Sequence, residues 1–239
     1  MFETNQIRIS VIIPTLNEEK SLSTLLPFLQ MHGGRQVCEV MVCDAGSTDQ
    51  TKQVAEHFGA TYLACKQKGR PFQMNEGAVC AKGNVLYFLH ADTIPPASFS
   101  EDILIHLNQG FEAGCYRYRF DSDRAILKRQ ARLTRYPFLI FRGGDQSLYI
   151  TKSLFDKING FDPHYFVMED YDIIRRLRKH TRFKIIPKEA VVSARKYDHN
   201  SYVRVNFANV VVFSLYYLGV SPKKLLRLYF RLINHPKAT

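Results

Sequence analysis

The sequence predicts an α/β domain with a mainly parallel central sheet, helices on both faces of that sheet, and amphipathic helices at the C-terminus. Short apolar runs alternate with segments of helical spacing over the first hundred residues, which is typical of consecutive βαβ units with right-handed crossovers. Hydrophobic residues make up 46% of the 239-residue chain and charged residues 23%, which is enough apolar mass for a core. The last forty residues combine helical spacing with basic charge.

The elements predicted in the first half follow from the apolar runs, which indicate strands, and from the segments of helical spacing between them. Runs rich in Val, Ile and Tyr are typical of strands buried on both faces. The predicted strands are Ile7–Pro14, Cys38–Cys43, Ala60–Cys65 and Asn84–His90. The predicted helices between them are Glu18–Met31, Asp49–Phe58 and Phe72–Ala81.

The second half mixes strands and helices. Alternating residue size predicts an added strand, and charge or apolar spacing predicts two helices. The strand is Glu112–Phe120, the helices are Arg124–Thr134 and Glu169–Lys179, and two further short strands are Phe183–Pro187 and Ala190–Ser193. Ser201 would cap a helix running to about Leu218, and Ser221-Pro222 would open another that reaches Ile233. We expect one domain, with the nucleotide-binding fold in residues 1–199 and a helical, basic appendage in residues 200–239.

Charge and cysteine content indicate which ligands the protein attracts and in which compartment it resides. The formal net charge is +11, and residues 195–239 hold eight Lys and Arg residues against the single acid Asp198. A second basic stretch, Arg117–Arg135, has seven basic residues. Such fields attract phosphates in nucleic acids, lipid headgroups or sugar nucleotides, and the sign alone does not choose among them. Five cysteines without a Cys-x-x-Cys pair, and no secretory signal in the first eight residues, favour a cytoplasmic protein.

Polar motifs follow three of the predicted strands. Pro14–Glu18 (PTLNE) follows the first, and Asp44–Asp49 (DAGSTD) follows the second. Ligands bind at the carboxyl ends of such strands, where Asp44 could accept hydrogen bonds from a base or ribose while the flexible Gly46-Ser47 turn lets it approach. Capping of the next helix is the structural alternative.

His90-Ala91-Asp92 follows the fourth predicted strand. In an extended segment His90 and Asp92 point the same way, and together they could hold a divalent cation that bridges two phosphates. A helix-capping Asp92 is again the alternative. The chain has no Gly-x-Gly-x-x-Gly after its first strand, which disfavours a dinucleotide site.

Five motifs in order resemble those of family 2 glycosyltransferases, which have the GT-A fold. They are Pro14–Glu18, Asp44–Asp49, the Asp92 segment, Gly160-Phe161-Asp162 and Glu169–Asp172 (EDYD). Ser193–Tyr197 and Gly219–Pro222 further resemble a small-enzyme branch with His-Ala-Asp at the metal motif. The resemblance runs from about Ile9 to Arg182.

The resemblance implies the following roles. Thr15 and Glu18 would line the uridine pocket, Asp44 would bind the uracil or ribose, and Asp92 would bind Mg²⁺ or Mn²⁺ as the last Asp of the family's Asp-x-Asp motif. His90 stands where that motif has its first Asp, which leaves the choice of metal open. The residues expected to contact the nucleotide or donor are Pro14, Thr15, Asn17, Glu18, Asp44, Gly46, Ser47, Arg70, Asn75, His90, Ala91, Asp92 and Arg195.

Glu169-Asp170 matches the catalytic motif of the family. Two neighbouring carboxylates beside a ligand can differ in pKa, so that one accepts a proton while the other orients the acceptor. We assign the general base to Asp170 and a supporting role to Glu169. A charged helix start is the structural alternative, and Gly143–Gln146 falls where relatives place a flexible acceptor loop or, equally, a plain turn.

The resemblance therefore predicts inverting transfer from a nucleotide-sugar, a UDP-sugar above all, to a glycan, lipid-linked or small-molecule acceptor, with no nucleic-acid partner. One alternative is a non-catalytic phosphate- or membrane-binding module that kept the fold. A sugar-nucleotide pyrophosphorylase would need a Gly-rich loop where Thr15–Glu18 stands.

The C-terminal segment also predicts a location. Its uncharged run, Val205–Pro222, is shorter than the roughly 20 residues that a spanning helix needs. In the next helix Leu225, Leu228, Tyr229 and Leu232 share one face, flanked by Lys223, Lys224, Arg227 and Arg231. Such a helix suits peripheral binding to an anionic membrane, here the inner face of the plasma membrane. The alternatives are packing on the protein's own core or a homodimer contact.

Overall fold

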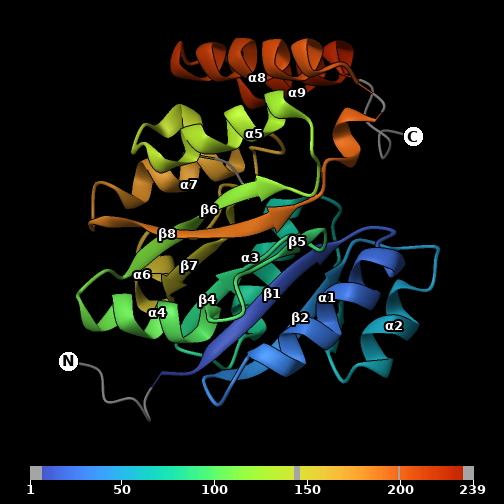
Figure 1. Ribbon diagram of the computed structural model, residues 1–239, viewed down its shortest axis with the longest axis vertical. Helices are drawn as coiled ribbons and strands as arrows, with labels where there is room; N and C mark the ends of the chain where they lie inside the picture. Colours follow the sequence, from blue (N-terminus) through green and yellow to red (C-terminus); the bar gives the residue numbers. More distant parts are fainter. Residues whose placement is uncertain (1–6, 143–145, 199, 234–239) are drawn as a thin grey trace.

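The computed structural model describes residues 7–142, 146–198 and 200–233. Within these residues, eight strands form one curved sheet in the order β3-β2-β1-β4-β7-β6-β8-β5 (Figure 1). The strands are β1 Ile9–Thr15, β2 Val37–Asp44, β3 Thr61–Ala64, β4 Val85–Phe88, β5 Thr93–Ile94, β6 Ala113–Phe120, β7 Leu148–Thr151 and β8 Phe183–Val192. Strands β1 to β4 pair in parallel, as do β6 and β8, whereas β7 is antiparallel to both of its neighbours.

Helices cover both faces of this sheet, as the sequence predicts. The α-helices are α1 Glu19–His32, α2 Thr51–His57, α3 Arg70–Cys80, α4 Phe99–Asn108, α5 Ala125–Arg132, α6 Lys152–Lys157, α7 Glu169–Leu177, α8 Tyr202–Tyr217 and α9 Pro222–Leu232. Short 3-10 turns are η1 Leu133–Arg135, η2 Leu139–Phe141 and η4 Arg195–Tyr197. Buried side chains of α1, α2 and α4 pack on one face, and those of α3, α6 and α7 pack on the other (Figure 1).

The core explains why these segments take these forms. All seven residues of β1 are buried, because helices lie on both sides of it. Leu22, Leu25, Leu26 and Leu29 put one stripe of α1 into the core, at the spacing of a helix face. On the other side α3 approaches the sheet closely at Gly77, where an added Cβ would lie 2.7 Å from both the Cys43 sulfur and an Ile12 methyl. This close approach brings the N-terminus of α3 to the carboxyl ends of β1 and β2.

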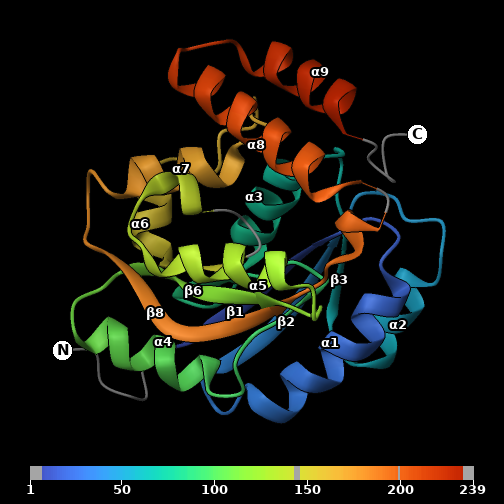
Figure 2. The same ribbon diagram turned by 45° about the horizontal axis from the view of Figure 1, so that its top comes forward.

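The C-terminal helices form an antiparallel pair on top of the domain (Figures 1 and 2). Val205 of α8 joins the cluster that includes Leu127 of α5, and Val212 packs with Met168 just before α7. In α9, Leu225 is fully buried in that second cluster. Leu225 and Tyr229 of the α9 stripe therefore pack on the protein itself, as the core-packing alternative states, and contact of this helix pair with a membrane stays a prediction. None of the helices described is both long and apolar enough to cross a bilayer.

Two local predictions differ from the structure, and a third falls mostly on residues that the structure does not describe. Phe183–Pro187 and Ala190–Ser193 are one strand, β8, because a register shift against β6 at Tyr116/Arg117 absorbs the interruption. No element was expected at α4, α6 or β7. The predicted loop Gly143–Gln146 lies outside the described residues except for Gln146, whose amide nitrogen donates to the Phe141 carbonyl at 2.7 Å.

Candidate active site

The carboxyl ends of β1 and β2 meet at one edge of the sheet, where Thr15 lies in register with Asp44. The Asp44 side chain is fully buried, and its Oδ2 accepts backbone N–H groups of Gly46 at 3.0 Å and Ser47 at 2.8 Å. It also accepts the hydroxyls of Ser47 and of Tyr62, the latter at 3.0 Å. Burial and this hydrogen bond to Asp44 raise the pKa of Tyr62 to about 12. The Asp44 carboxylate thus fixes the Gly46-Ser47 turn. It does not cap the next helix, α2, whose N-cap is Gln50.

The loops after β1 and β2 are tied to each other. Asn17, at a left-handed φ of 53°, donates its backbone N–H to the Ser47 hydroxyl at 2.7 Å and accepts from the Thr48 N–H at 2.8 Å. Gln73 of α3 donates its side-chain amide to the carbonyls of Thr15 and Cys43, both at 2.7 Å. Gln73 is not among the residues predicted from the sequence, where its signal is a polar side chain on the apolar face of a predicted helix.

Arg195 joins two of the predicted carboxylates. Its guanidinium binds both oxygens of Glu18, at 2.6 and 2.9 Å, and its Nη2 lies 2.8 Å from Asp92 Oδ2. The Glu18 side chain is buried and that of Asp92 is three-quarters buried, whereas Arg195 is half exposed. The bond to Glu18, with Asp92 nearby, raises the pKa of Arg195 further above its ordinary value. Glu18, Asp92 and Arg195 therefore meet at the edge of the sheet where the sequence placed the nucleotide.

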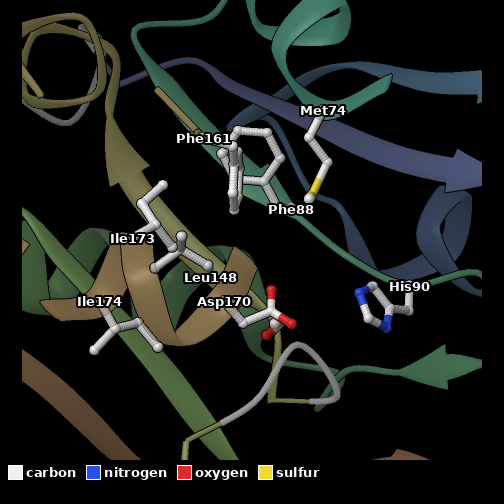
Figure 3. Close-up of a pocket in the computed structure, with 9 residues that line it drawn as sticks. Met74, Phe88, His90, Leu148, Phe161, Asp170, Ile173 and Ile174 are labelled. Carbon is white, nitrogen blue, oxygen red and sulfur yellow. The ribbon is translucent and has the colours of Figure 1, made fainter. Parts of the chain in front are cut away.

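His90 lies in a turn rather than in an extended segment, because the Thr93 N–H donates to the His90 carbonyl at 3.1 Å. The alternation that would align His90 with Asp92 therefore does not apply. His90 and Asp170 form the polar part of a pocket (Figure 3). The remaining lining is mainly apolar, from Met74, Phe88, Ser147, Leu148, Phe161, Ile173 and Ile174. A carboxylate and an imidazole thus face a small cavity with apolar walls.

The two carboxylates at the start of α7 lie in different environments. Met168, at a left-handed φ of 71°, turns the chain into the helix. Glu169 is buried, and Arg70 Nη1 lies 3.3 Å from its Oε1. Burial, and then the neighbouring Asp170 charge, raise the pKa of Glu169 to about 7. Asp170 is half-buried and lines the pocket. The pair therefore separates into an inward carboxylate held by Arg70 and an outward one facing the cavity.

Two further contacts position Arg70 and the loop before α7. Gly69, at a φ of 125°, leaves room for Phe166, whose ring would lie 2.7 Å from an added Cβ. Asn75 uses both ends of its amide on the backbone of Phe161, at 2.8 and 2.9 Å. Asn75 thus holds the segment that leads to α7, and its predicted contact with the donor stays a prediction.

The structure brings the predicted residues together in two adjoining groups. Glu18, Asp92 and Arg195 meet beside the turn that Asp44 holds. His90 and Asp170 line the pocket, and Arg70 pairs with Glu169, the residue before Asp170. His90 and Asp92 belong to one turn and so connect the groups. Among the residues described, no three His, Cys, Asp or Glu side chains cluster as a metal site would require. Asp92 and His90 fit a divalent cation only if phosphate oxygens supply further ligands, which is how Mg²⁺ is commonly bound.

Comparison with known proteins points to one family. Residues 10–175 match the profile described as "Glycosyl transferase family 2". A curated relative, the "PGL/p-HBAD biosynthesis glycosyltransferase" of Mycobacterium bovis, is 28% identical over 189 residues, which cover 68% of this chain and 66% of the relative. The chain spans only about a third of the length of two other curated relatives.

Two solved structures share the fold. The mannosyltransferase PcManGT of Pyrobaculum calidifontis, solved with GDP-Man and Mn²⁺, superposes with a TM-score of 0.70 at 21% identity, covering 96% of this chain and 70% of that one. TarS of S. aureus, solved with UDP, superposes with a TM-score of 0.66 at 18% identity, covering 79% and 61% of the two chains. At these identities the likeness extends to the fold alone.

Proposed function

The chain belongs to glycosyl transferase family 2, with the GT-A fold, and from that premise we propose that it transfers a sugar from a UDP-sugar to an acceptor hydroxyl with inversion. The observation that carries the proposal is the different placement of the two carboxylates at the start of α7. Asp170 faces the pocket while Arg70 holds Glu169 inside the protein. The carboxylates Asp44, Asp92, Glu169 and Asp170 are all present, which disfavours the non-catalytic alternative.

The donor would bind at the edge where β1 and β2 end. Thr15, Glu18 and Asp44 would surround the uracil and ribose. The Asp44 carboxylate already accepts five hydrogen bonds, so a ribose hydroxyl could reach it only by replacing a donor such as the Ser47 hydroxyl. The sugar-diphosphate would then extend toward Asp92, Arg195 and the pocket.

A Mg²⁺ or Mn²⁺ ion would be held by Asp92 together with oxygens of the diphosphate. His90 would add a ligand only by turning from the pocket toward Asp92. When bound, such an ion neutralises charge that grows on the departing diphosphate. PcManGT, solved with Mn²⁺, supports this proposal. Arg195 would have to release Asp92, at least in part, because the same carboxylate oxygen binds its guanidinium at 2.8 Å. Its positive charge would then be available to the phosphates.

Asp170 would act as the general base. Its position on the pocket allows it to take the proton from an acceptor hydroxyl as the new glycosidic bond forms. Glu169 and Arg70 would hold the first turn of α7 in place. Because the donor is already activated, no second catalytic carboxylate is needed.

Thermal unfolding with a panel of UDP- and GDP-sugars, with and without Mn²⁺, tests the donor and the metal together. A UDP-sugar with Mn²⁺ should raise the unfolding midpoint most, because ligands stabilise the fold they bind. Asp92→Ala should lose the Mn²⁺-dependent part, and Lys82→Ala, on the α3–β4 connection, is a control. Equal shifts for all nucleotides would refute the uridine assignment. Full glycosyl transfer in the presence of EDTA would refute the proposed role of a divalent cation.

The compartment is also a proposal. All five cysteines are unpaired, which supports a reducing cytoplasm. We place the enzyme there, at the inner face of the plasma membrane, with a glycan, a lipid-linked molecule or a small molecule as acceptor.

A further inference from the structure

The C-terminal helix pair presents an unusual surface to solvent. Helix α8 is apolar on two opposite sides. Its inner side is buried and consists of Val205, Ala208, Val212 and Tyr216. Its outer side carries five large apolar side chains, between 50% and 78% exposed, and these are Val203, Phe207, Val210, Tyr217 and Leu218. We call these five residues the α8 outer stripe.

The α8 outer stripe follows the geometry of a helix face. At 100° per residue, Val203, Phe207, Val210 and Tyr217 fall within about 40° of one line along the helix. The only other residue on that line is Ser214, which is exposed. Adjoining exposed apolar side chains of this size commonly mark an interaction site, and no residue of the described chain covers the α8 outer stripe. The outer stripe therefore calls for an external partner.

The neighbouring helix supplies positive charge beside this stripe. Lys223, Lys224, Arg227 and Arg231 are exposed on α9, on the side opposite the buried Leu225. The two helices lie side by side on the domain (Figures 1 and 2). Because both bury one side against the protein, their other sides face outward together. The chain has no acidic residue after Asp198, so nothing in the helix pair offsets these cations.

A second basic segment adjoins the N-terminal part of α8. Leu127 and Ala131 of α5 share a buried cluster with Val205. The exposed basic residues here are Arg124, Lys128, Arg129, Arg132 and Arg135. Lys128 pairs with Asp123 and Arg124 with Asp198. Tyr136 and Phe138, which follow α5, are 47% and 63% exposed. Exposed aromatic and basic side chains thus continue beyond the helix pair.

We infer that the outward side of the α8–α9 pair docks on an anionic membrane surface. Apolar and aromatic side chains next to several uncompensated cations match the interface of such a bilayer, where acyl chains and negative headgroups lie together. An apolar protein partner would cover the α8 outer stripe but would leave the α9 cations without counter-charges. A second copy would bring like charges together. Charge complementarity therefore favours the lipid surface.

Flotation of the full-length protein with vesicles tests the inference. One set contains phosphatidylcholine alone, and the other contains two parts phosphatidylcholine to one part phosphatidylglycerol. The protein should float with the anionic vesicles and be released by high salt. Vesicle binding needs neither donor nor acceptor, so this result is independent of the proposed glycosyl transfer. Absence of binding to anionic vesicles would overturn the inference.

Two variants separate the contributions of the helices. Phe207→Ser combined with Val210→Ser should weaken vesicle binding, because it removes two apolar side chains of the α8 outer stripe. Both side chains are at least half exposed, so the variant should still fold. A matched control is Met31→Ser with Val79→Ser, which removes apolar side chains that are 79% and 81% exposed elsewhere. The control should bind like wild type. Equal loss in both proteins, or in neither, would contradict docking through the α8 outer stripe.

The charge variant is Lys223→Gln, Lys224→Gln and Arg227→Gln. Each cation near an anionic surface is worth about fivefold in partitioning, so the triple variant should bind about 100-fold more weakly. Sedimentation velocity then tests whether a second copy of the chain covers the surface instead. A concentration-dependent dimer that dissociates in the Phe207→Ser/Val210→Ser protein, with no vesicle binding by wild type, would assign the surface to a second copy and refute the membrane.

Discussion

At the scale of single residues, Asp170 and Glu169 differ by their surroundings and not by their chemistry. They are adjacent carboxylates in the first turn of α7, where the partial positive charge of the helix N-terminus favours negative charge. Glu169 points inward to Arg70, and Asp170 lines the pocket beside His90. The motif identifies the pair, but only the three-dimensional arrangement separates its two members.

Replacement of Asp170 by Asn should lower turnover by about 10²–10⁴-fold, because the amide keeps the shape but cannot accept the proton. Donor affinity, measured by calorimetry, should barely change. Asp162→Asn is the matched control, since that carboxylate lies in the preceding loop and pairs with His164 at 2.8 Å. Near-normal turnover of the Asp170→Asn protein would show that another residue acts as the general base.

Glu169 should make the stability of the protein depend on pH. Its pKa rises from an ordinary 4.5 to about 7 on folding, mainly because it is buried. Between these values the folded protein binds more protons than the unfolded chain, so the free energy of unfolding falls as pH rises through this interval. Unfolding midpoints measured from pH 4.5 to 8 should decline less in Glu169→Gln than in wild type.

A second variant separates the causes of this shift. Asp170→Asn removes the neighbouring negative charge, which should lower the pKa of Glu169 and move the loss of stability to lower pH. If Glu169→Gln and wild type show the same dependence on pH, Glu169 does not titrate in this range and its raised pKa is wrong.

At the scale of elements, α8 supports the catalytic helix directly. The Tyr216 hydroxyl donates to Asp172 at 3.1 Å, and the same carboxylate pairs with Arg175 and Arg176. Met168, the residue before Glu169, packs against Val212. The C-terminal helices therefore form part of the framework of the site.

Tyr216→Phe should reduce the free energy of unfolding by about 1.5–3 kcal/mol, the usual contribution of a buried hydrogen bond to a charged group. It should also lower kcat more than it changes KM, because Asp172 shares the first turn of α7 with Asp170. Tyr217→Phe is the matched control, because Tyr217 is the next residue in the helix and is 57% exposed. Equal effects in the two variants would show that the hydroxyl of Tyr216 does not hold α7.

The sequence predicted the elements unevenly, for physical reasons. Strands β1 and β4 are recognisable because burial on both faces leaves continuous apolar runs. β7, Leu148–Thr151, was missed although all four of its residues are buried. In β8, Pro187 suggests a break that the bulge accommodates. The stripe of α9 was recognised as apolar, but periodicity cannot say whether protein or membrane covers a stripe.

The site shows the same limit. Motif order brought Glu18, Asp92 and Arg195 into one list of donor residues, although their roles stay a prediction. The sequence could not predict that Arg195 bridges the other two, since 177 positions separate it from Glu18. Gln73 was missed because its function is to hold the backbone at the ends of β1 and β2, which carries no motif.

At the scale of the whole molecule, the appendage and residues 1–199 should unfold as one unit. Val205 and Leu225 are fully buried against the rest of the chain, in clusters that include Leu127 and Met168. Deletion of residues 200–239 would expose these partners to water. We expect a single calorimetric transition for the full chain. The midpoint of the truncated protein should be lower by more than about 10 °C, because it loses the buried Val205, Val212 and Leu225, at about 1.5–3 kcal/mol each, and the Tyr216–Asp172 hydrogen bond. Phe207→Ser with Val210→Ser should leave the midpoint unchanged, because those side chains contact solvent. Two separate transitions in the full chain, or an unchanged midpoint after truncation, would instead make residues 200–239 an independent unit.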